Sequence, residues 1–246
     1  MNKLIVFFTL VAITLASCDS KSAWDILKTA GKTVSEEREI EPFGKVELLD
    51  RVNLDICQDT AYKLILTGPK NLLPKISTRV EDGTLTIADN NSCNWVRDYE
   101  HRITAKVHVK QLNRIYYEGI GNITTTNKLT VDTLIIRSFQ SAGSINLDVT
   151  LKYFHCYFDQ SLVDLHIAGT ANRVHAQING TGFLYCHELI TPHCVAFNQG
   201  SGDIYVYASN YLHGIIEGSG NVFYTGNPSS TEFRYIGRGS GRFVPF

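Results

Sequence analysis

The sequence predicts an all-β chain that folds as a β-helix, a solenoid in which strand–turn–strand rungs stack along one axis. A five-residue motif, with glycine favoured at its first and third positions, returns through the second half of the chain at intervals of 18 to 22 residues. A repeat of this length is typical of a solenoid, whose units bury their apolar faces only by stacking on one another. The copies begin at Gly119, Ser141, Ser161, Gly180, Gly200, Gly218 and Gly239.

Alternation within each copy supports the same fold. The fifth motif position is apolar in every copy, from Ile123 to Phe243, and the position two residues later is mostly apolar. Because residues two apart on a strand share a face, these positions predict buried columns along the interior of the coil. The runs before each turn, such as 133–136 and 193–197, also suit strands, but their apolar positions shift by a residue and leave the register open.

The glycines of the motif predict tight turns. Glycine at these positions suits a turn with positive φ, which a side chain would strain, so we interpret them as conformational and not catalytic. Val163 and the serines that begin two copies depart from the pattern and predict a different turn there. The predicted turn glycines are Gly119, Gly121, Gly143, Gly180, Gly182, Gly200, Gly202, Gly218, Gly220, Gly239 and Gly241.

Residues 1–17 predict a lipoprotein signal peptide. Lys3 precedes an apolar run over 4–15 that is too short to span a bilayer stably. The following Leu15-Ala16-Ser17-Cys18 resembles the bacterial lipobox, which implies cleavage before Cys18 and a lipid anchor on that cysteine. The alternative is an ordinary secretory peptide, and either peptide predicts export from the cytoplasm.

The segment 18–37 is mostly polar and predicts a tether, and the folded domain is expected from 38 to 246. Its first part, 38–115, has less regular strands, and its second part, 116–246, holds the repeats. Alternating apolar residues predict strands around 46–56, 62–66 and 103–109, and a bulky turn over 71–76. Asp82-Gly83 predicts a hairpin between 77–80 and 85–87, followed by a polar loop over 90–99.

The cysteines leave two questions open. Beyond Cys18 there are five, so at least one thiol is unpaired, and a bridge between Cys57 and Cys93 is one open pairing. Histidine stands next to Cys156, Cys186 and Cys194. Neighbours on a strand point to opposite faces, however, so we interpret Cys186 as a small buried hydrophobe and expect no metal site.

Several stretches together resemble a known family. The lipobox, PFGKVEL over 42–48, NLLPKISTRVEDGTLTI over 71–87 and the glycine turns are similar to the autotransporter adhesin family with the head GIN domain, a family of Bacteroidetes cell-envelope proteins. The resemblance covers about 38–246. It implies a right-handed β-helix of the pectin-lyase type and no catalytic residues, and it supplies no functional residue to transfer.

Composition and motifs argue against several activities. A net charge of −1 gives no electrostatic reason to bind nucleic acid. Asp164 and Asp203 share a motif position two rungs apart, which favours turn chemistry over a paired-carboxylate site. The GSGD stretch at Gly200 lacks the consecutive nine-residue units of calcium-binding repeats. We expect no catalytic residues and no cofactor.

The candidate binding surface is a strip of rings between the two buried columns. Alternation turns these positions outward, and the repeat places them on successive rungs. Stacked rings stabilise a sheet by themselves, but an exposed strip of them also suits a glycan or a protein partner. The residues of this surface are Tyr185, Tyr205, Tyr207 and Phe223.

These observations favour a non-enzymatic, lipid-anchored protein of the cell envelope, expected in the outer membrane, that binds a glycan or an envelope or host protein. The alternative is a carbohydrate-active β-helix enzyme, which requires a cluster of carboxylates on one face. Self-association through the aromatic strip or an open end of the coil is a third reading. The ligand and the membrane leaflet are not fixed by the sequence.

Overall fold

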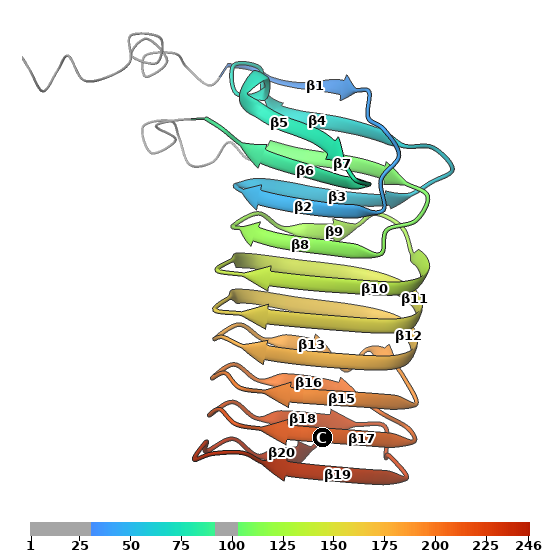
Figure 1. Ribbon diagram of the computed structural model, residues 1–246, viewed down its shortest axis with the longest axis vertical. Coiled ribbons are helices and arrows are strands. Elements are labelled where there is room, and N and C mark those ends of the chain that lie inside the picture. The colour runs from blue at the N-terminus through green and yellow to red at the C-terminus, as the bar shows by residue number, and fades with distance from the viewer. Residues whose placement is uncertain (1–30, 92–102) are drawn as a thin grey trace, which may run out of the picture.

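The computed structural model describes residues 31–91 and 103–246. The predicted signal peptide, Cys18, the first part of the tether, Cys93 and most of the polar loop lie outside the described residues. The described chain is all-β apart from one 3-10 turn at Leu73–Lys75. It forms a long column of stacked rungs, a β-solenoid of about seven turns (Figure 1). No helix in the described ranges is long and apolar enough to cross a membrane.

One side of the column is a parallel sheet, the first sheet, built from the strands that follow the motif turns. Its register is the predicted one, because Leu165, Leu184, Ile204 and Val222 lie on successive rungs. The sheet contains β3 (Val52–Gln58), β9 (Ile123–Thr125), the beginnings of β11 (Ala142–Asp159) and β12 (Leu162–Asn179), β13 (Leu184–Cys186), β16 (Ile204–Tyr207), β18 (Val222–Thr225) and β20 (Phe243–Pro245).

The opposite side is the second sheet, built from the runs that precede the turns. Here the pairing supplies the register that the sequence left open: Phe154 lies opposite Val174, which lies opposite Cys194. The sheet contains β2 (Lys45–Asp50), β8 (Arg114–Gly119), β10 (Leu129–Phe139), the ends of β11 and β12, β15 (His193–Asn198), β17 (Tyr211–Ile216) and β19 (Ser230–Tyr235). The short β14 (Leu189–Ile190) pairs with the middle of β12 at the corner between the sheets.

The core lies between the two sheets, and the predicted columns fill it. Ile123, Leu165 and Ile204 are fully buried, as the alternation predicts. Cys186 is also buried, together with Cys156 and Cys194, and all three are free thiols. The interpretation of Cys186 as a buried hydrophobe is therefore confirmed. Burial raises the pKa of the Cys194 thiol, which keeps it neutral.

The N-terminal part corrects two sequence expectations. The predicted tether ends too late, because β1 (Thr33–Arg38) already pairs antiparallel with β4 (Lys63–Pro69). The solenoid also begins earlier than the glycine motif, since β2 lies parallel to β8 and β3 parallel to β9. These rungs were missed because long insertions separate their strands in the sequence.

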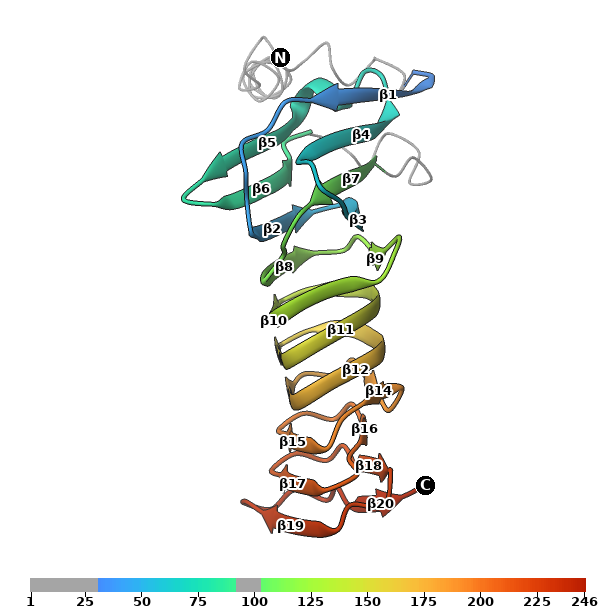
Figure 2. The ribbon, with the colours of Figure 1, turned by 90° about the vertical axis from the view of Figure 1, so that its right-hand side faces the viewer.

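The insertions form a cap at the N-terminal end of the column. β4 continues the first sheet by pairing antiparallel with β7 (Ile103–Val109), which itself lies parallel to β3. The predicted hairpin is present as β5 (Ile76–Glu81) and β6 (Thr84–Asp89), with positive φ at Asp82 and Gly83. In Figure 2 this hairpin projects from the column beside β1 and β4.

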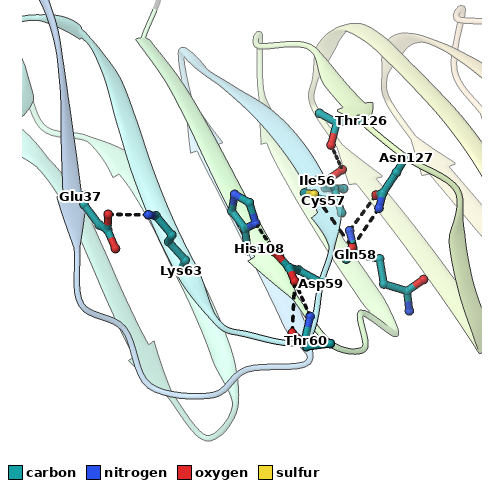
Figure 3. A network of polar contacts seen from close by, with 10 residues as sticks. All are labelled: Glu37, Ile56, Cys57, Gln58, Asp59, Thr60, Lys63, His108, Thr126 and Asn127. Carbon is teal, nitrogen blue, oxygen red and sulfur yellow. Dashed lines mark hydrogen bonds and ion pairs between the residues drawn. The ribbon is translucent and has the colours of Figure 1, made fainter.

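Polar contacts join the cap to the first rungs (Figure 3). The amide of Gln58 donates to the backbone oxygens of Lys110 and Thr130 at 3.0 and 2.9 Å, so it links the cap to β10. Nδ1 of His108 lies 2.9 Å from a carboxylate oxygen of Asp59. That hydrogen bond lowers the pKa of the Asp59 carboxyl, and the backbone N–H of Thr60 adds to the effect.

The turn glycines have a different cause from the one predicted. Among them only Gly143 has a positive φ, of 126°. The others are required by the stacking distance: a Cβ built on Gly202 would lie 1.7 Å from the carbonyl oxygen of Gly182, and one on Gly220 would lie 2.0 Å from that of Gly202. Each glycine therefore lets its backbone approach the backbone of the preceding rung.

The two rungs without leading glycines turn differently, as expected. Their positive φ falls on Gln140 and Gln160, at 47° and 49°, just before the serines. Inside the coil, the hydroxyl of Ser138 lies 3.0 Å from those of Ser141 and of Ser161. Buried polar groups at these turns are thus paired by serine hydroxyls.

Candidate functional site

Four outward rings on the first sheet form a continuous stack, which we call the ring ladder: His166, Tyr185, Tyr205 and Phe223. Successive ring centroids lie 4.4, 5.1 and 4.7 Å apart, with interplanar angles between 7° and 20°. The rings come from β12, β13, β16 and β18, whose register brings them together. The predicted strip is therefore present for Tyr185, Tyr205 and Phe223, and it continues to His166.

The orientation of the rings decides what the ladder can offer a ligand. Nearly parallel rings at these separations must cover one another's faces, because rings lying side by side in one plane would clash. Tyr185, Tyr205 and Phe223 are half-buried and present their edges, whereas His166 at the end of the stack is exposed. The next rung there carries Asn146, whose amide turns to donate to the hydroxyl of Ser144 at 3.3 Å. Among residues 31–91 and 103–246, no ring is therefore stacked on the second face of His166.

The C-terminal residue covers part of the ladder, which the sequence did not predict. The ring of Phe246 stands nearly perpendicular to Tyr205 and Phe223, with centroids 5.9 and 6.3 Å away. It remains 57% exposed itself. The strip is consequently a stack of ring edges with one additional ring, that of Phe246, packed on it.

Tyr207 is the member of the predicted strip that the structure does not bring onto the ladder. It lies on the same outward side of β16, but among the described residues no ring stacks on it. Its ring packs against Gly226 instead, where φ is 93° and a Cβ would lie 2.8 Å from a Tyr207 ring carbon. Tyr207 is therefore set apart from the other rings by the corner of the coil.

The ladder is electrically neutral at its two phenols. Burial raises the pKa of Tyr185, and the carboxylates of Asp164 and Asp203 add to the effect. The pKa of Tyr205 is also raised, again by burial and then by Asp203 and Tyr185. Both hydroxyls therefore stay protonated at neutral pH and are available to donate hydrogen bonds.

The carboxylates beside the ladder are engaged by the backbone. Asp164 accepts a hydrogen bond from the N–H of Phe183 at 3.0 Å, and Asp203 accepts one from the N–H of Asn221 at 2.7 Å. Each carboxylate thus links its rung to the next, which is the turn role that the sequence favours. Within residues 31–91 and 103–246, no group of three or more His, Cys, Asp or Glu side chains could hold a metal ion.

A groove with a volume of about 440 Å³ opens at the His166 end of the ladder. It lies at the corner where the first sheet ends, over four successive rungs. Its polar and ring-bearing lining residues are Thr125, Asn146, Asp148, His166, Tyr185, His187 and Glu188. Of these residues, only Tyr185 belongs to the binding surface that the sequence predicts.

A bulge in the chain shapes one wall of this groove. Leu184 lies opposite Leu165 and Leu189 lies opposite Gly169, so the later rung has one residue more between these positions. The extra length turns His187 and Glu188 outward, as β-bulges do when they redirect side chains. Gly169 itself has a φ of 121° and closely approaches the preceding rung, where a Cβ would lie 1.9 Å from the carbonyl oxygen of Val149.

His187 packs edge-on against the ladder. Its ring centroid lies 6.5 Å from Tyr185 and 6.1 Å from Tyr205, and 5.7 Å from Phe246. Its Nδ1 atom is buried and has no hydrogen-bond partner among the described residues. Such an unsatisfied polar atom is uncommon in the interior of a folded protein.

Comparison with known proteins agrees with the fold. A family model described as "Putative auto-transporter adhesin, head GIN domain" matches residues 42–228. No curated protein matches the chain.

Solved structures from Bacteroidetes share the architecture. A protein described as a putative adhesin from Bacteroides fragilis is 24% identical, covers 87% of this chain and 97% of its own, and has a TM-score of 0.81. One described as a putative lipid binding protein from Parabacteroides distasonis is 21% identical, with coverages of 87% and 97% and a TM-score of 0.68. One described as a putative adhesin from Parabacteroides merdae is 18% identical, with coverages of 88% and 98% and a TM-score of 0.58. At these identities the likeness shows the fold.

Proposed function

Because the chain belongs to the family of auto-transporter adhesins with a head GIN domain, we propose that it is a non-enzymatic adhesion protein of the cell envelope. In this proposal, a lipid on Cys18 anchors the protein in the outer membrane. The ring ladder binds a glycan, an envelope protein or a host protein. The observation that carries the binding role is the stack of outward rings on four successive rungs.

The ring ladder suits binding for a physical reason. Each ring edge offers apolar area, and the two protonated phenols can donate hydrogen bonds at fixed positions. Stacking restricts the rings before a partner arrives, which lowers the entropy that binding must overcome. The carboxylates nearby are held by backbone N–H groups, which supports binding over acid–base catalysis.

The binding proposal predicts a loss of adhesion in the double variant Tyr205→Ser, Phe223→Ser. Removing two ring contacts is expected to weaken binding at least about tenfold, since one well-packed aromatic contact contributes roughly 1–2 kcal/mol. The measurement is binding of the purified protein to a glycan array and to whole cells, with circular dichroism to check the fold.

The matched control is Tyr157→Ser, Phe197→Ser. These rings also face outward and are half-buried, but they lie on the second sheet. The control is expected to bind as the unchanged protein does. Equal binding by both folded double variants would remove the ring ladder as the adhesion surface, and a loss confined to self-association would make a second copy of the chain the partner.

The anchor is tested separately with Cys18→Ser. Without the thiol no acyl chain can be attached, and the protein is expected to leave the membrane fraction or to keep its signal peptide. Cell fractionation and the mass of the mature chain measure both outcomes. A variant that is cleaved correctly and still sediments with membranes would contradict the lipid anchor.

A further inference from the structure

We propose that the groove at the His166 end of the ring ladder is a saccharide subsite that holds one pyranose ring against the open face of His166. This inference rests on the proposed binding function and names the ligand class for one part of that surface. The juxtaposition of an uncovered ring face, hydrogen-bonding side chains and the wall formed at the bulge sets this groove apart from the rest of the ladder.

The uncovered face of His166 supplies the apolar contact. Every other ladder ring has neighbours on both sides or a perpendicular ring across its edge. His166 stacks on Tyr185 on one side, and the next rung presents only Asn146, which is turned toward Ser144. A flat ligand can therefore continue the stack by one layer, and the C–H face of a pyranose has the shape for that position.

The rim of the groove supplies acceptors for hydroxyl groups. Asp148 and Glu188 are both exposed carboxylates, and Asp148 lies 3.3 Å from the ammonium group of Lys128. The imidazole of His187 lines the same groove. Two carboxylates beside an apolar floor can accept hydrogen bonds from several hydroxyl groups, which is what a sugar ring presents.

Size and charge are compatible with a sugar. The volume of about 440 Å³ lies near the lower end of the roughly 300–1,000 Å³ of small-molecule sites, and a monosaccharide fits within it. Two carboxylates at the rim repel anions such as phosphorylated headgroups. The ligand is therefore a neutral or amino sugar unit, either at the end of a glycan or within it.

The test uses the folded protein from residue 19 onward and four probes: the methyl glycosides of glucose, galactose and mannose, and N-acetylglucosamine. Saturation-transfer NMR at millimolar sugar detects contact, and a titration followed by ¹H–¹⁵N spectra gives the affinity. His166→Ala is expected to weaken binding of the responding probe at least fivefold, and Glu188→Gln to weaken it less. His155→Ala is the control, because His155 is also a stacked histidine, 4.5 Å from His175, on the second sheet.

The outcomes separate this inference from the proposed function. Absence of saturation transfer for all four probes, or equal affinity of the folded His166→Ala and His155→Ala variants, would overturn the saccharide subsite. If adhesion is still lost in the Tyr205→Ser, Phe223→Ser variant, the proposed binding function stands without it. The subsite is confirmed if a probe binds the unchanged protein and if only the His166→Ala and Glu188→Gln variants bind that probe more weakly. This result does not depend on whether cell adhesion needs the rest of the ladder.

Discussion

Gly202→Val is expected to prevent folding or to lower the free energy of unfolding by more than about 4 kcal/mol, a size that few single substitutions reach. A Cβ on Gly202 would lie 1.7 Å from the carbonyl oxygen of Gly182, 2.8 Å from its carbonyl carbon and 3.0 Å from the carbonyl carbon of Thr181. These are backbone atoms of the preceding rung, so no side-chain rotation can relieve the overlap. The rungs would have to separate, and the hydrogen bonds between them would be lost.

The neighbouring rungs make this position harder to accommodate. Gly182, Gly220 and Gly241 are stacked with Gly202, and each would place a Cβ within 2.1 Å of a backbone oxygen. Separation at Gly202 therefore disturbs the packing of the rungs on both sides. Because each rung of a solenoid is stabilised mainly by its neighbours, the defect is expected to unfold the C-terminal rungs together.

The control for Gly202→Val is Gly44→Ala, a glycine of the same chain with room for a side chain. Its Cβ would lie 3.6 Å from the nearest atom, in the side chain of Asn113, and its φ is not positive. We expect a change within about 1 kcal/mol there. Urea unfolding followed by circular dichroism gives both values. A Gly202→Val variant as stable as Gly44→Ala would refute close backbone approach as the reason for glycine at this position.

The glycine column shows which part of the fold the sequence could reveal. The repeat and the period-2 alternation are properties of the chain itself, so they predicted the coil, the buried columns and the outward rings. The prediction of a positive φ at Gly202 was wrong, because glycine is needed there by the close backbone of another rung and not by the local turn. Contacts of that kind depend on the stacking distance, which no local pattern encodes.

In the candidate site, too, the repeat predicts some residues, whereas contacts between rungs determine the others. Tyr185, Tyr205 and Phe223 were identified because they occupy one motif position on successive rungs. The position of His187 in the groove depends on pairing between rungs, because a single extra residue before Leu189 becomes a bulge only when the two rungs are paired. Phe246 was missed because the chain end has no repeat to align.

Asn198→Ala is expected to lower the free energy of unfolding by roughly 2–6 kcal/mol, since the buried carbonyl of Gly202 and the half-buried N–H of Gly200 would each lose a partner at about 1–3 kcal/mol. Its side-chain amide donates to the carbonyl oxygens of Gly202 and Asn221 at 2.8 and 3.0 Å. Its side-chain oxygen accepts from the N–H of Gly200 at 3.0 Å. Asn198 is fully buried, so water cannot replace these bonds without entering the coil.

Asn127→Ala is the matched control for Asn198→Ala, because Asn127 makes the same kind of bonds at the surface. Its amide donates to the backbone oxygen of Gln58 at 2.9 Å, and its side-chain oxygen accepts from the N–H of Gln58 at 2.8 Å. Water can take over both bonds there, so the expected cost is about 1 kcal/mol. Urea unfolding of the two variants measures the loss of unfolding free energy in each. If Asn198→Ala costs no more than Asn127→Ala, burial of the amide adds nothing, and the glycine turn between Asn198 and Gly202 is held by its backbone alone.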